Sequence, residues 1–319
     1  MVNKQYDLIG DVHGNAFVLV GLLEKMGYQL GDSGYAHPER TVIFLGDYID
    51  RGPEQVETLE IVMSMVASGA AVALMGNHEF NALSMLTRDP ERPKERLRPM
   101  SDSNFMMHCE FLAAVKTHAD MLPILAFFRG LPLWLDLPDL RAVHACWDDR
   151  AIAAIRPYLN DDNTLTTEGL IAANKEGSAA FVAVETLLKG IECPLPDTDM
   201  FDDFNGETRR HFRAKWWLDS AETIHDMASP EGIIKPEKRH LPPFLDVLIG
   251  YSGPKPLFIG HYWLPWNDMP PQPLRPQLAC LDYFVDFDQL LVGYRWQGES
   301  ALTAENYVWV LEKERVWDL

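Results

Sequence analysis

The feature that most constrains the fold is a pattern that occurs three times within the first 80 residues. Each time, a short apolar run rich in branched side chains stops at a glycine and a polar cluster, and helical periodicity follows. The apolar runs are residues 6–9, 41–45 and 70–75, and amphipathic stretches at 16–26 and 53–67 separate them. This order predicts parallel strands joined by crossover helices. Ligands of such sheets bind beyond the carboxyl ends of the strands.

Polar side chains that can bind metals follow these predicted strands. The clusters read GDVHG at 10–14, GDYIDRG at 46–52 and GNHE at 76–79, and later runs end at His144 and His261. Oxygen and imidazole donors together favour Mn, Fe or Zn over calcium, and there are enough of them for two ions. GDVHG alone would more often be an ordinary glycine-rich turn. Chance agreement across all the clusters is negligible, which favours a metal centre.

Composition excludes several classes of protein. Of the 319 residues, 47% are hydrophobic, which suffices for a sizeable core. The 28 Lys and Arg against 47 Asp and Glu give a net charge of −19, which argues against nucleic acid as a partner. The four cysteines form no C-x-x-C pair, so a zinc finger or disulfide framework is not expected. Without a signal-peptide pattern or about 18 successive apolar residues, we expect a cytoplasmic protein that does not bind membranes.

Together, the motifs resemble the calcineurin-like metallophosphoesterase superfamily, and in particular its bacterial phosphoprotein phosphatase branch of serine/threonine phosphatases. That branch carries G-D-x-H-G, G-D-x-x-D-R-G and G-N-H-E, followed by two separated histidines. The resemblance implies an α/β fold in which a two-sheet β-sandwich is flanked by helices, in the order α/β/β/α. It also implies a single domain over residues 1–319.

Two segments have no counterpart in these motifs. We expect a helical cap insertion at about 84–135 and a further insertion at about 148–245. The last strand-like runs, at 278–282, 289–295 and 307–311, suggest an antiparallel second sheet.

The resemblance implies a set of metal ligands for two divalent ions, with manganese favoured in vitro. Asp11 and His13 would hold one ion, Asp47 would bridge both ions, and the second ion would be completed by Asn77, His144 and His261. One carboxylate can join two cations about 3.5–4 Å apart. Such a pair would lower the pKa of a shared water, and the resulting hydroxide would attack phosphorus in line.

Three further residues acquire catalytic roles from the same resemblance. His78 would protonate the leaving oxygen, and Asp50 would orient the His78 ring through a hydrogen bond. Arg51 would bind the phosphoryl oxygens and neutralise their charge.

Other candidate residues are less firmly placed by the sequence. The family uses a second phosphate-binding arginine between the two late histidines, where Arg209, Arg210 and Arg213 occur, and Arg213 is the expected one. His108 belongs to no motif and is expected in the core or on the surface.

Taken together, these features predict a phosphatase for phosphomonoesters, either phosphoserine and phosphothreonine proteins or small phosphate esters. The alternative is a hydrolase of dinucleotide polyphosphates such as diadenosine tetraphosphate, or a phosphodiesterase. Asp50 and Glu79 favour the protein-phosphatase pattern. The symmetrical diadenosine tetraphosphatases lack an Asp at the position of Asp50, and their third motif ends in Asp where this chain has Glu79. A non-catalytic phosphate-binding protein is disfavoured, because no expected ligand is missing.

Overall fold

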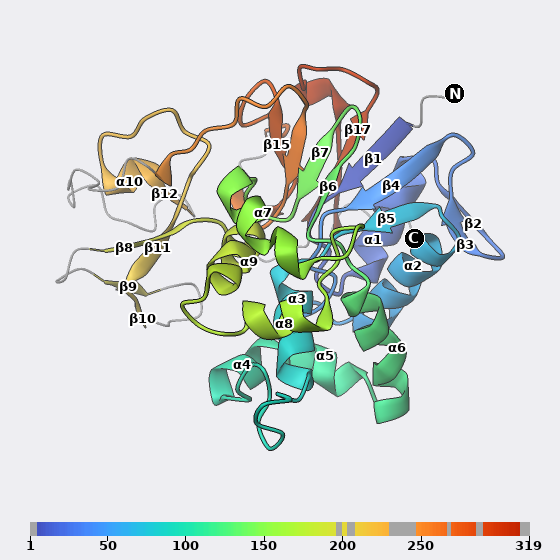
Figure 1. The fold of residues 1–319 in the computed structure, drawn as a ribbon. Helices are drawn as coiled ribbons and strands as arrows, with labels where there is room; N and C mark the ends of the chain where they lie inside the picture. Colours follow the sequence, from blue (N-terminus) through green and yellow to red (C-terminus); the bar gives the residue numbers. More distant parts are fainter. Residues whose placement is uncertain are drawn as a thin grey trace.

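The strands that precede the first three polar clusters lie side by side in a five-stranded sheet (Figure 1). A computed structural model describes residues 5–195, 200–202, 208–229, 247–266, 269–284 and 290–312. Strands β1 (Gln5–Ile9), β4 (Arg40–Phe44) and β5 (Ala71–Ala73) are parallel, as the sequence predicts. Their carboxyl ends therefore open onto one edge of the sheet.

The C-terminal strands do not form an antiparallel second sheet, so that expectation is wrong. Strand β17 (Leu290–Trp296) pairs antiparallel with β1, and β18 (Tyr307–Leu311) pairs antiparallel with β17. They extend the first sheet and cover the edge of β1 that the parallel strands leave open. Strand β15 (Leu278–Cys280) instead lies parallel to β13 (Leu257–Ile259) in the second sheet.

The second sheet has the strand order β15-β13-β7-β6 and packs face to face on the first. Strand β7 (Arg141–Val143) is parallel to β13, and β6 (Trp134–Asp136) is antiparallel to β7. Alternate residues divide between two cores, because successive strand side chains point to opposite faces. Leu8 and Phe258 join the cluster between the sheets, whereas their neighbours Ile9 and Ile259 join the other hydrophobic cluster.

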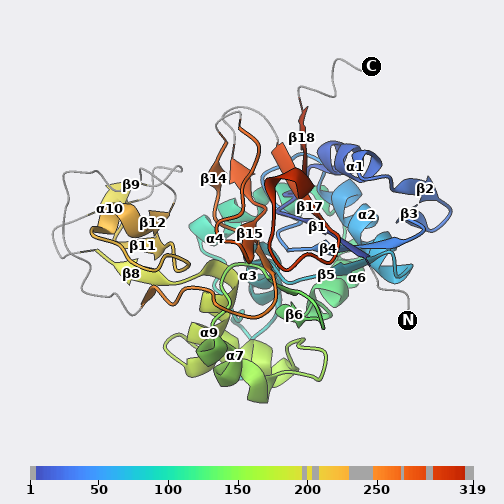
Figure 2. The same cartoon turned by 90° about the horizontal axis from the view of Figure 1, so that it is seen from above.

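Helices cover the outer faces of both sheets (Figure 2). Helices α1 (Ala16–Lys25) and α2 (Gln55–Ala67) flank the first sheet. On the opposite side lie α7 (Asp149–Ile155), α8 (Thr167–Ala173) and α9 (Ala179–Lys189). The α/β/β/α architecture of the metallophosphoesterase fold is thus confirmed.

The segment expected to form a cap is helical. It begins within α3 (Asn77–Leu86), whose residues Asn77 to Met85 are all buried. Three helices follow: α4 (Asp102–Met107), α5 (Cys109–Ala114) and α6 (His118–Arg129). They lie beyond the end of α3 in Figure 1.

The second insertion adds a small sheet beside the sandwich. Strands β8 (Glu192–Pro194), β11 (His211–Ala214) and β12 (Ala228–Ser229) form it. The described residues do not include 196–199, 203–207 and 230–246. The organisation of the chain as a single domain stays a prediction. Among the described helices, none is both long enough and apolar enough to cross a membrane.

Short elements complete the described part of the chain. They are β2 (Gln29–Gly31), β3 (Gly34–Ala36), β9 (Phe201–Asp202), β10 (Thr208–Arg209), α10 (Ile224–Met227), β14 (Leu264–Pro265), β16 (Tyr283–Phe284) and the 3₁₀ turns η1 (Arg156–Tyr158) and η3 (Ala304–Asn306).

Candidate metal centre

All six predicted metal ligands follow strands of the two sheets. Asp11 and His13 come after β1, Asp47 after β4, Asn77 after β5, His144 after β7 and His261 after β13. Because β1, β4 and β5 run parallel in one sheet, and β7 and β13 run parallel in the other, the candidate ligands gather at one end of the sandwich. The sheet topology therefore brings together residues up to 250 positions apart, such as Asp11 and His261.

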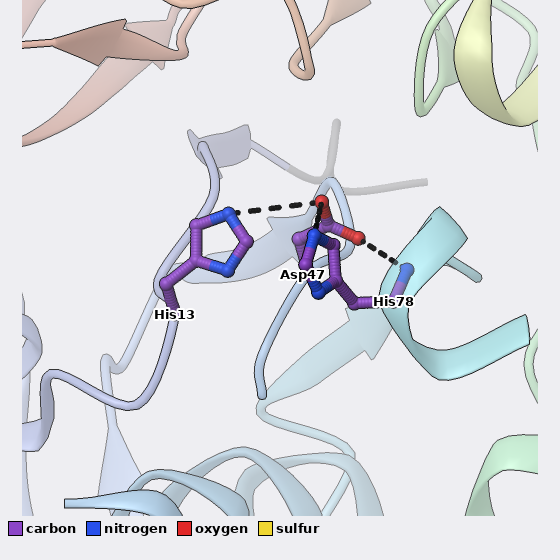
Figure 3. Close-up of side chains that lie close together, drawn as sticks. All are labelled: His13, Asp47 and His78. Carbon is purple, nitrogen blue, oxygen red and sulfur yellow. Dashed lines mark hydrogen bonds and ion pairs between the residues drawn. The ribbon is translucent and has the colours of Figure 1, made fainter. Parts of the chain in front are cut away.

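Asp47 lies at the centre of the cluster and is 1% exposed. Its Oδ2 atom is 3.7 Å from His13 Nε2, 3.8 Å from His78 Nε2 and 3.4 Å from His144 Nε2. The backbone N–H of His78 donates to Asp47 Oδ1 at 3.0 Å. Figure 3 shows the rings of His13 and His78 directed toward the Asp47 carboxylate. A carboxylate so placed is suited to bridge two cations.

The histidines are oriented so that their Nε2 atoms face Asp47. His13 Nδ1 donates to Ile49 O at 2.9 Å, and His144 Nδ1 donates to Leu45 O at 2.8 Å. These bonds leave the Nε2 lone pairs free for a cation. The Nε2 atoms of His13 and His261 are buried without a hydrogen-bond partner. Buried polar atoms normally have partners, so these two nitrogens fit the role of metal ligands.

A second group forms around Asp47, His144 and His261, whose donor atoms lie within 4.8 Å of one another. Asn77 Oδ1 is 3.2 Å from His144 Nε2, which places the amide oxygen beside this group. The Asp11 carboxylate accepts the backbone N–H of His261 at 3.1 Å. The structure thus assembles the predicted ligands, and their mixed oxygen and nitrogen donors suit Mn, Fe or Zn.

Burial strongly perturbs the ionisable ligands. Burial raises the pKa of the Asp11 carboxyl well above its ordinary value, and the nearby Asp282 carboxylate adds to the effect. Burial and the charge of Arg51 hold the pKa of His13 well below its ordinary value. Burial and the charge of Arg213 lower the pKa of His261 in the same way. His13 and His261 are therefore neutral imidazoles near neutral pH, which is the form that binds metals.

Strained backbone is concentrated at this edge. Among the described residues, seven other than glycine have a positive φ, and only Asn163 lies away from this edge. The other six are His13, Asp47, Asp50, Arg51, His261 and Trp263, and all of these but Trp263 belong to the polar clusters. Left-handed backbone is uncommon in residues other than glycine and clusters at functional sites.

Close packing explains two of the motif glycines. A Cβ atom on Gly76 would lie 2.2 Å from Asp47 Oδ1, and one on Gly260 would lie 2.1 Å from Asp11 Oδ1. Any side chain at either position would displace a candidate metal ligand. These glycines serve close approach, which only residues without Cβ permit.

The predicted catalytic residues lie beside the ligand cluster. His78 Nδ1 donates to Asp50 Oδ2 at 2.5 Å, while the Nε2 atom of His78 faces Asp47. Burial raises the pKa of Asp50, but hydrogen bonds from His108 and His78 outweigh it and leave that pKa below its ordinary value. The Arg51 side chain is exposed, and its guanidinium carbon lies 3.9 Å from the centroid of the Trp263 ring.

Of the three arginines of the second insertion, Arg213 contacts a predicted metal ligand. Arg213 lies on β11, and its Nη1 donates to His261 O at 3.4 Å. Its Nε atom is buried without a partner. Arg209 and Arg210 have exposed side chains. Arg213 therefore stands next to a predicted metal ligand, as a phosphate-binding arginine would require.

A family model described as calcineurin-like phosphoesterase matches residues 6–143. This segment supplies four of the six predicted ligands and ends directly before His144. These residues belong to the calcineurin-like phosphoesterase family. The described fold and the clustered ligands agree with this family.

Similar proteins match about a quarter of this chain. The asymmetrical bis(5'-nucleosyl)-tetraphosphatase PrpE of Halalkalibacterium halodurans is 43% identical over 75 residues, which is 23% of this chain and 30% of that protein. The Bacillus subtilis protein of the same name is 36% identical over 74 residues, with 23% and 30% covered. The match thus spans less than a third of the length of these relatives.

Solved structures also align with most of this chain. A protein serine/threonine phosphatase from Saccharomyces cerevisiae is aligned over 98% of this chain and 80% of that chain, with 14% identity and a TM-score of 0.47.

Glu79 has a role at this site that the sequence interpretation missed. In the sequence, Glu79 was used only to distinguish the branches of the family. Its buried carboxylate accepts the backbone N–H groups of Asp47 and Gly76 on Oε2, at 2.9 and 3.1 Å. Its Oε1 accepts those of Tyr48 and Ile49 at 2.7 and 3.3 Å. Glu79 therefore fixes the strained loop that carries Asp47. The Glu that follows Asn-His in the third motif was the sequence signal that could have indicated this role.

Replacing Glu79 with glutamine should lower the free energy of unfolding by about 2–3 kcal/mol, because an amide N–H₂ would face backbone donors and leave them unsatisfied. Urea denaturation measures the change. Glu60→Gln, on the exposed face of α2, is the matched control and should leave the urea midpoint unchanged. An equal midpoint for the Glu79 variant would contradict the proposed role of its carboxylate.

Proposed function

We propose that this phosphoesterase is a phosphatase dependent on two divalent ions, acting on phosphomonoesters. Its substrates would be phosphoserine or phosphothreonine in proteins, or small phosphate esters. The observation that supports this most is the His78–Asp50 pair, joined at 2.5 Å, with the His78 Nε2 atom facing Asp47. A phosphomonoester with an alcohol leaving group needs a proton on that oxygen as the bond breaks, and a positioned imidazole can supply it.

Each residue has a defined task in this proposal. Two ions would be held by Asp11, His13, Asp47, Asn77, His144 and His261. When bound, the ions supply positive charge for the phosphoryl oxygens and acidify a water molecule. Arg51 and Arg213 would bind the phosphoryl oxygens and keep them oriented. His78 would give the Nε2 proton to the leaving oxygen, while Asp50 holds the Nδ1 proton.

Removal of metal provides the first test of the proposal. Turnover of p-nitrophenyl phosphate should fall at least about 100-fold after chelation and return when manganese is added, because the ions supply most of the charge stabilisation. The rates before chelation, after chelation and after addition of Mn, Fe or Zn are the measurement. Activity that survives chelation, or no activity with any of these metals, would contradict the proposal.

Hydrolysis of a dinucleotide polyphosphate is the second candidate function. The PrpE relatives are named for this activity, and they match 23% of the chain at 43% and 36% identity. In addition, the partly exposed ring of Trp263 next to Arg51 offers an aromatic surface at the site. Parallel assays with diadenosine tetraphosphate and a phosphothreonine peptide would decide between the two by their kcat/KM values.

A further inference from the structure

Asp50 accepts hydrogen bonds from two imidazoles on a single oxygen. His78 Nδ1 lies 2.5 Å and His108 Nδ1 lies 2.6 Å from Asp50 Oδ2. All three side chains are buried. A carboxylate oxygen has two lone pairs, so it can accept both bonds when each Nδ1 atom carries a hydrogen.

His108 comes from the cap rather than from any motif loop. It lies between α4 and α5, where its backbone N–H donates to Phe105 O and its carbonyl accepts Leu112 N–H. Phe111, one turn further along, is fully buried in the main hydrophobic cluster and anchors this part of the cap. The position of the His108 ring is therefore fixed by the fold of the cap.

The geometry points to His108 as a positioning residue: it holds Asp50 so that the His78 ring keeps its Nε2 atom directed at the reacting phosphate. This inference rests on the proposed phosphatase function. His108 itself cannot act on substrate through Nε2, because that atom is buried without a partner. Its ring meets the His78 ring edge-on, with centroids 6.1 Å apart, so it also limits how far that ring can turn.

The same three residues could in principle bind a third ion, but the distances argue for hydrogen bonds. Nitrogen and oxygen ligands of one tetrahedral ion at 2.0–2.2 Å stand roughly 3 Å or more apart. The observed separations of 2.5 and 2.6 Å are shorter and suit hydrogen bonds with a charged acceptor. The hydrogen-bonded arrangement is the one we test.

Two variants of His108 separate positioning from packing. His108→Leu removes the donor and keeps much of the volume, whereas His108→Asn places an amide N–H₂ where Nδ1 lies. We expect kcat for p-nitrophenyl phosphate to fall about tenfold in the leucine variant, as is typical when a supporting hydrogen bond is lost. The loss should be larger for phenyl phosphate, whose leaving group depends more on protonation, and smaller in the asparagine variant. His37→Asn, remote from the site, serves as the control.

A second readout does not depend on activity. NMR of protein labelled with ¹⁵N-histidine should show the His78 Nδ1–H resonance altered in His108→Leu and largely restored in His108→Asn. Equal losses of kcat with the two substrates, together with an unchanged His78 resonance, would overturn the inference. So would a third bound metal ion that His108→Leu removes. If the wild-type protein lacked phosphatase activity with every metal, the proposed function would fail, while the NMR comparison would still test the contact.

Discussion

Replacing Asp47 with asparagine is expected to lower the turnover of p-nitrophenyl phosphate by about 10³-fold or more. Asp47 Oδ2 lies 3.4–3.8 Å from the Nε2 atoms of His13, His78 and His144, so its charge serves both groups of ligands. Asparagine offers one neutral oxygen, which cannot balance two cations. Manganese bound per chain should therefore drop below two ions, and elemental analysis of the dialysed protein measures this.

The fold should survive the Asp47 substitution. An asparagine Oδ1 can still accept the His78 N–H, which the carboxylate accepts at 3.0 Å. Asp148→Asn is the matched control, because Asp148 is also buried but caps α7, a task that asparagine performs equally well. Two ions per chain and a wild-type rate in Asp47→Asn would show that Asp47 does not bridge the metals.

The position of the candidate site could be predicted from the sequence because the signal is local. A strand of four or five residues, a glycine and a polar cluster lie within ten positions, and parallel strands necessarily bring such clusters to one edge. The clusters around Asp11 and Asp47 could therefore be placed without knowing the rest of the chain. The same reasoning placed Asn77 and His78 at this edge.

Other features depend on contacts between distant segments. The antiparallel pairing of β17 with β1 joins Tyr6 to Trp296, and no local pattern distinguishes it from pairing within a separate sheet. His108 meets Asp50 across 58 residues, through a cap whose path only packing determines. Arg213 differs from its neighbour Arg210 only because β11 directs it toward His261. In each case, spacing along the chain holds no information about the partner.

Replacing His78 with asparagine is expected to reduce kcat by about 10²–10⁴-fold, the range for loss of a positioned acid or base. His78 also belongs to a group with His13 and Asp47 that could hold a metal, with its Nε2 3.8 Å from Asp47 Oδ2. The two roles give different results. If His78 donates a proton, its loss should slow phenyl phosphate more than p-nitrophenyl phosphate, because the p-nitrophenolate departs readily without protonation, and two manganese ions should remain bound.

If His78 were instead a ligand, the variant would lose an ion and both substrates would slow equally. Metal content and the ratio of the two rates, measured on the same preparation, therefore distinguish the acid from the ligand. His37→Asn should change neither quantity, which shows that any effect belongs to this site. We expect two ions and a changed ratio, because the 2.5 Å bond from Nδ1 to Asp50 fixes the His78 ring with its Nε2 atom on the side of Asp47, as a positioned proton donor requires.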